Sequence, residues 1–96
     1  MRPSETLEIN KAAARDILRR FPAGNLRVFG SVARGDDTDG SDLDLLVDAL
    51  PGATLFDLGG LQVELETLMG VRVDLLNPGE LSPRYRDRVL AEARPV

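Results

Sequence analysis

Asp42 and Asp44 alternate with leucines in the segment DLDLLVD, which otherwise has the composition of a buried β-strand. Side chains two positions apart on a strand share a face, so the two carboxylates stand side by side while Leu43 and Leu45 face the core. Carboxylates whose oxygens approach within about 4 Å repel each other by about 4 kcal/mol at an effective dielectric constant near 20. The pair therefore favours a bound cation, and its oxygen ligands suit Mg²⁺ better than Zn²⁺.

A third carboxylate, Asp74, lies in the apolar segment VRVDLL, which precedes the turn sequence NPG. On a neighbouring strand Asp74 could complete a site for two metal ions about 3.5 to 4 Å apart. Each acid also has a plainer interpretation. An Asp-x-Asp pair alone is often a solvated strand edge with an arginine partner, and Asp74 could pair with Arg72 or Arg86.

The segment GSVARG follows a short β-rich run, Leu26 to Phe29. Small residues at such a point are typical of a tight connection, but glycine also lets backbone N–H groups approach a phosphate at a helix N-terminus. Ten residues then separate Ser31 from the carboxylate pair, so Gly30-Ser31 and the acids should lie at one edge of the same sheet. Arg34 either reaches phosphate or pairs with an acid of its own loop.

The rest of the chain supplies the elements that position these residues. Hydrophobic periodicity and capping signals predict three longer helices, at about Glu5–Arg20, Phe56–Met69 and Ser82–Arg94. Strands are expected at Leu26–Phe29, Asp42–Asp48 and Val71–Leu76. The predicted fold class is α/β (α+β), a small mixed sheet of about three strands flanked by helices. We expect the remaining acids to be solvated, in the loop at Asp36, Asp37 and Asp39 and on a helix surface at Glu64 and Glu66.

Composition narrows the possible functions. With 96 residues, 43% of them hydrophobic, we expect residues 1–96 to form one small domain. A net charge of -4 without a basic stripe argues against direct nucleic-acid binding. The absence of cysteine and histidine excludes disulfides, thiolate metal sites and triads with a histidine base. No apolar run reaches the roughly 20 residues of a membrane span, and no signal peptide is evident, so we expect a cytoplasmic protein without membrane contact.

The order Gly30-Ser31, ten residues, Asp42-x-Asp44, in the fuller form GSVARGDDTDGSDLDLLVD, resembles the signature of the minimal nucleotidyltransferases of the DNA polymerase β-like superfamily. The resemblance extends over essentially the whole chain. It implies a polymerase β palm-like core in which Gly30 and Ser31 hold a nucleoside triphosphate, Asp42 and Asp44 bind Mg²⁺, and Asp74 helps to activate the attacking hydroxyl. Arg34 and Ser41 complete the predicted nucleotide-binding set, and all of these residues address phosphate or metal rather than a base.

Members of this family are commonly antitoxins encoded beside a HEPN-domain toxin ribonuclease, which they neutralise by transferring AMP from ATP to a toxin tyrosine. The resemblance therefore implies ATP as substrate, two Mg²⁺ ions, and a HEPN toxin as partner in a possible hetero-oligomer. An acidic chain also fits a basic, RNA-cutting partner. Two alternatives stay open: an antitoxin that neutralises its partner by binding alone, and a nucleotidyltransferase that acts on RNA or a small molecule, for which we expect no second domain to hold the acceptor.

Overall fold

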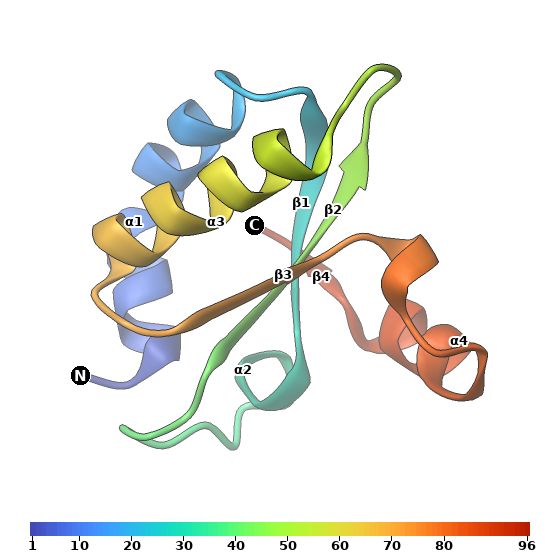
Figure 1. Ribbon diagram of the computed structural model, residues 1–96. Helices are drawn as coiled ribbons and strands as arrows, with labels where there is room; N and C mark the ends of the chain where they lie inside the picture. Colours follow the sequence, from blue (N-terminus) through green and yellow to red (C-terminus); the bar gives the residue numbers. More distant parts are fainter.

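The computed structural model describes residues 1–96, which form a mixed sheet of four strands in the order β3-β2-β1-β4 (Figure 1). The strands are β1 Ala23–Phe29, β2 Leu43–Ala49, β3 Val73–Leu76 and β4 Arg94–Pro95. Strand β2 runs antiparallel to β1 and parallel to β3, and β4 runs antiparallel to β1. The predicted mixed α/β class is confirmed, with one strand more than the expected three.

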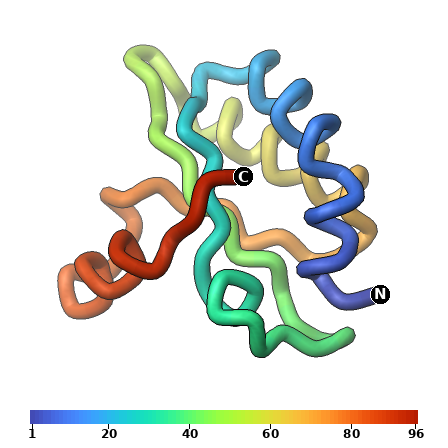
Figure 2. Tube along the Cα trace, turned by 180° about the vertical axis from the view of Figure 1, so that it is seen from behind, coloured from blue at the N-terminus to red at the C-terminus, as the bar shows by residue number.

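The extra strand corrects the predicted end of the last helix. Helix α4 spans Pro83–Glu92 and does not reach Arg94, which instead pairs with Val28 of β1. Pro95 explains the difference, because a proline disfavours the helical conformation of the residue before it. The Val96 N–H then donates to the Leu26 carbonyl oxygen at 3.0 Å. The last residues of the chain thus lie hydrogen-bonded alongside β1, as Figure 2 shows from behind.

The helices cover the two faces of the sheet unequally. Helices α1, Pro3–Leu18, and α3, Leu55–Met69, lie on one face, whereas α4 lies on the other (Figure 1). Two short elements complete the fold, the helix α2 at Gly30–Arg34 and the 3₁₀ turn η1 at Pro78–Glu80. None of the helices has the length and apolar character needed to cross a bilayer.

Strand β2 is buried on both faces, and its alternation decides where the acids lie. Leu43, Leu45 and Val47 belong to the larger core under α1 and α3, and all three are completely buried. Leu46 belongs to a smaller core with Phe29 under α4. Because alternate residues share a face, Asp42 and Asp44 point to the same side as Leu46, the side that carries α4.

The loop between α2 and β2 is less solvated than its composition predicted. Asp37 is only 5% exposed, and its Oδ2 accepts a hydrogen bond from the Ser4 N–H at 2.9 Å. Negative charge is favourable at the N-terminus of α1 because the first N–H groups of a helix lack partners within the helix. The prediction was therefore wrong for Asp37, while Asp36 and Asp39 are exposed as expected.

Replacing Asp37 with alanine should lower the free energy of unfolding by about 1 kcal/mol, the usual value of a helix cap. The Ser4 N–H bond lowers the pKa of Asp37 below 3.8. The contribution of Asp37 is thus present above that pH and lost as the pH falls through the lowered pKa. Urea unfolding at about pH 7 and about pH 3 measures this difference. Asp39→Ala, an exposed acid of the same loop, is the matched control, and an equal effect of both variants would contradict the capping role.

Candidate active site

Strand register gathers the three predicted catalytic acids on the face that carries α4. In the parallel pair of β2 and β3, Asp44 lies directly opposite Asp74, and in the antiparallel pair with β1 it lies opposite Phe29. Asp42 precedes the first residue of β2 and shares the side of Asp44. The structure therefore brings Asp42, Asp44 and Asp74 to one place, with Asp44 at the centre.

The electrostatics of Asp44 reflect this crowding. Partial burial and the neighbouring charges of Asp74 and Asp42 raise the pKa of Asp44 to about 6, against an opposing effect of Arg34. None of the ion pairs of the chain involves any of the three acids. In particular, Arg86 does not pair with Asp74 but donates to the carbonyl oxygens of Pro78 and Leu81. No ion pair therefore offsets the repulsion that Asp74 and Asp42 exert on Asp44, and only the charge of Arg34 opposes it.

The ligands that this group offers fit Mg²⁺. Every donor is a carboxylate oxygen, which is the ligand type that Mg²⁺ prefers, and the chain has no histidine or cysteine that would favour zinc. No three acidic side chains lie close enough together to enclose an ion by themselves. An ion held here would complete its coordination with water and phosphate oxygens, as Mg²⁺ usually does.

Gly30 is the point at which the phosphate-type loop comes closest to the acids. It starts α2 directly after β1, with a positive φ of 71° that side chains rarely allow. A Cβ atom at this position would lie 2.2 Å from the Oδ2 atom of Asp44. Glycine is therefore required twice, by the backbone conformation and by the approach of the loop to the carboxylate.

Glu92 is a site residue that the sequence analysis missed. Its Oε2 accepts the Gly30 N–H at 3.1 Å, and its Oε1 accepts from Nη1 of Arg34 at 3.0 Å. Although burial works against it, these two contacts lower the pKa of Glu92. The Nε atom of Arg34 also lies 3.6 Å from Oδ2 of Asp36. Arg34 thus pairs with an acid of its own loop, which is one of the two roles predicted for it. No local signal could reveal Glu92, because 62 residues separate it from Gly30.

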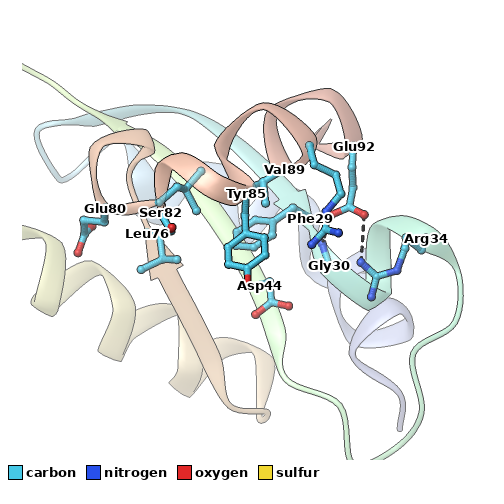
Figure 3. Close-up of a pocket in the computed structure, with 12 residues that line it drawn as sticks. Phe29, Gly30, Arg34, Asp44, Leu76, Glu80, Ser82, Tyr85, Val89 and Glu92 are labelled. Atoms are coloured by element: carbon cyan, nitrogen blue, oxygen red, sulfur yellow. Dashed lines mark hydrogen bonds and ion pairs between the residues drawn. The ribbon is translucent and has the colours of Figure 1, made fainter.

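A cavity of about 390 Å³ lies between α4 and the sheet (Figure 3). Gly30, Arg34 and Asp44 of the predicted set line it. The other predicted residues do not line it: Ser31, Ser41, Asp42 and Asp74. The Ser41 hydroxyl instead accepts the Thr38 N–H at 2.8 Å within the loop. Glu64 and Glu66 lie on α3, on the opposite face of the sheet, and Glu64 pairs with Arg20 there.

The residues of α4 that line the cavity were also not predicted from the sequence. Of the larger apolar and aromatic residues of α4, Tyr85, Val89 and Leu90, only Val89 is buried. Tyr85 and Arg88 line the cavity instead, next to Glu92. The spacing of these residues along α4 puts them on one side of the helix, the side toward the sheet.

The sequence model of the nucleotidyltransferase domain family matches residues 11–96, which include the whole site. The chain belongs to this family. Protein adenylyltransferase MntA of Thermococcus cleftensis is 35% identical over 88 residues, covering 92% of this chain and 89% of its own. A relative from Methanocaldococcus jannaschii, provisionally named a protein adenylyltransferase, is 39% identical over 77 residues, covering 80% of this chain and 83% of its own.

Solved structures with the same fold agree with this assignment. A structure provisionally described as a minimal nucleotidyltransferase superposes with a TM-score of 0.86 at 47% identity, covering 97% of this chain and 95% of that chain. A toxin–antitoxin crystal structure with AMP-PNP superposes with a TM-score of 0.75 at 22% identity, covering 90% and 71%. The predicted nucleotidyltransferase core is thus confirmed, and the chain is a nucleotidyltransferase.

Replacing Asp44 with asparagine should stabilise the metal-free protein near neutral pH. The pKa of Asp44 is about 6 in the folded state against an ordinary 3.8, so folding favours the protonated form and wild-type stability falls as the pH rises through that interval. Asparagine mimics the protonated form at every pH. Because Asp44 is only partly buried, we expect a gain of about 1 kcal/mol at about pH 7 and almost none at about pH 4.

Thermal unfolding at both pH values tests this, with Asp87→Asn, an exposed acid on α4 without an ion pair, as control. Added Mg²⁺ should reduce the difference by stabilising the wild type. A variant that is less stable than the wild type at both pH values would mean that Asp44 has a stabilising partner.

Replacing Gly30 with alanine should lower the free energy of unfolding by about 2 kcal/mol or more, because the new Cβ meets Asp44 and strains a left-handed backbone. Gly59→Ala in α3 is the matched control. A Cβ there meets no atom within 4 Å, and alanine favours the helix, so that variant should be slightly more stable. Urea unfolding of both variants measures the contrast, and equal stabilities would show that the loop relaxes without cost.

Proposed function

We propose that this chain is a Mg²⁺-dependent protein adenylyltransferase that transfers AMP from ATP to a tyrosine of a HEPN-domain toxin ribonuclease and so acts as its antitoxin. The observation that carries the proposal is the contact between the Gly30 backbone and the Asp44 carboxylate, with Asp74 opposite Asp44 across the strands. It supports the proposal because a loop of the phosphate-binding type would then lie against a group of acids suited to a hard metal ion.

The roles of the residues follow from their positions. The Gly30 N–H already donates to Glu92. The triphosphate would therefore bind to the other N–H groups at the start of α2 and to the Ser31 hydroxyl. Asp42, Asp44 and Asp74 would hold Mg²⁺, which when bound would neutralise phosphate charge and orient the substrate. Arg34 pairs with Glu92 and Asp36, and it would add positive charge beside the phosphates by exchanging one of these acids for a phosphate oxygen.

The transfer itself needs an acceptor hydroxyl in line with the bond that breaks. The acceptor oxygen would bond to the α-phosphorus while the bond to the bridging oxygen of the β-phosphate breaks and pyrophosphate leaves. The hydroxyl proton would pass to a carboxylate, since the chain has no histidine. Asp74 is the best placed acceptor of that proton for a large substrate, because it is exposed whereas its neighbours in β3 are buried.

The size of the cavity favours an acceptor that comes from outside. About 390 Å³ is within the range for one small-molecule ligand. The other cavities lie beside α1, β4 and α3, away from the three acids. A nucleotide would therefore occupy the site alone, and the hydroxyl would be presented by a second protein. The relatives named protein adenylyltransferases and the toxin–antitoxin structure with AMP-PNP support the same assignment for this chain.

The proposal is tested by incubating the purified chain with ATP, Mg²⁺ and the HEPN protein encoded beside it. Intact-protein mass spectrometry should show the addition of AMP to a partner tyrosine together with loss of ribonuclease activity. Asp42→Asn combined with Asp44→Asn should remain folded but transfer at least 100-fold more slowly, because the metal ligands are lost. Asp87→Asn is the matched control and should transfer normally.

Three results would contradict the proposal. A fully active, folded Asp42/Asp44 double variant would show that these acids do not hold the catalytic metal. A partner silenced at equal stoichiometry without modification would show neutralisation by binding alone. Adenylylation of a small hydroxylated molecule, with the partner protein untouched, would show a different acceptor class.

A further inference from the structure

The cavity beside α4 has two chemically different ends (Figure 3). Gly30 and Arg34 lie at one end, where Glu92 already binds both as an anion. Leu76 and Glu80 lie at the opposite end, and on that side Tyr85 extends from α4 toward Asp44 (Figure 3). The cavity thus runs from an anion-binding end, past Asp44 and the Tyr85 ring, to an end lined by Leu76 and Glu80.

Tyr85 is the distinctive residue of this side of the cavity. It is the single tyrosine of a chain without tryptophan, and it is 46% exposed although it lines the cavity. The guanidinium carbon of Arg88 lies 5.3 Å from the centroid of the ring, which is a cation–π contact, and Arg88 makes no ion pair. A ring that is held in place but remains half exposed is a surface on which another flat group can stack.

The two ends of a nucleotide differ in the same way as the two sides of the cavity. Its phosphates are anionic, its base is flat and aromatic, and its α-phosphate lies between them. With the phosphates toward Gly30 and Arg34, the α-phosphate would lie near Asp44 and the base would reach the Tyr85 side. The opposite orientation would place the anionic phosphates beside Leu76 and the acid Glu80, and the base against the charged pair of Arg34 and Glu92, which is unfavourable for both groups.

We infer that the Tyr85 side of this cavity is a nucleobase subsite, in which the base of the bound nucleotide stacks on Tyr85 while Arg88 holds the ring. This rests on the proposed function for the presence of a nucleotide and adds the residue that recognises its base. Stacking is tolerant of sequence because every base has a π-face. The subsite therefore increases affinity for nucleotides over inorganic polyphosphate without strong selection among bases.

The test compares two ligands that share phosphates and differ in the base. Calorimetric titration measures binding of Mg-ATP and Mg-tripolyphosphate to the full chain. Tyr85→Ala should weaken Mg-ATP binding roughly tenfold or more, the usual effect of losing one aromatic stacking partner, and leave tripolyphosphate binding unchanged. Tyr85→Leu should behave like the alanine variant while preserving apolar contacts of α4, whereas Tyr85→Phe should bind Mg-ATP like the wild type. Leu90→Ala, on α4 but outside the cavity, is the matched control.

The chain also provides its own optical probe. With one tyrosine and no tryptophan, its intrinsic emission reports on Tyr85 alone. Mg-ATP should quench this emission as the base stacks, and Mg-tripolyphosphate should not.

Several results would overturn the inference. The subsite is wrong if Tyr85→Ala binds Mg-ATP like the wild type, or if it loses both ligands equally. A loss of Mg-ATP binding in Tyr85→Phe would assign the effect to the hydroxyl instead of the ring. AMP found covalently on Tyr85 would make this residue an acceptor instead of a stacking platform.

If AMP transfer to the partner proceeds while Tyr85→Ala binds normally, only the subsite fails. If the wild type binds no Mg-ATP, the proposed function fails with it.

Discussion

The structure depends on one close approach, that of the Gly30 backbone to the Asp44 carboxylate. Asp44 is fixed by β2, which is hydrogen-bonded to β1 on one side and β3 on the other. Gly30 is fixed because β1 ends at Phe29 and the chain turns at once into α2 with a positive φ. Any side chain at position 30 would separate the loop from the carboxylate. The antiparallel pairing of β1 with β2 therefore determines both the shape of the loop and its distance from the acids.

Placing three carboxylates on one sheet face opposes folding, and the other face compensates for it. The larger core under α1 and α3 contains completely buried leucines from β2 and α3, such as Leu43, Leu45, Leu61 and Leu65. Each buried leucine contributes about 1.5 to 3 kcal/mol, so a few of them exceed the repulsion around Asp44. The face toward α4 has only a small core and can therefore carry charged groups and an open cavity.

The sequence was informative where function depends on neighbours along the chain. Alternation in β2 placed Leu43 and Asp44 on opposite faces, and the interval after Ser31 placed the loop beside the acids, because both are consequences of local geometry. Contacts between distant segments left no such signal. Glu92 reaches Gly30 from the far end of the chain, and Asp37 is buried only because the N-terminus of α1 lies above it. Strand β4 is two residues long, too short for any periodicity.

Helix α4 links the two ends of the cavity, because Tyr85, Arg88 and Glu92 recur on one of its sides. Its C-terminal end is doubly fixed, by the ion pair of Glu92 with Arg34 and by β4, which follows after one residue and pairs with β1. Its N-terminal end is fixed less firmly, by the Ser82 cap and by two hydrogen bonds from Arg86 to carbonyl oxygens. The helix is therefore held more firmly where it borders the loop at Gly30 than where Tyr85 lines the cavity.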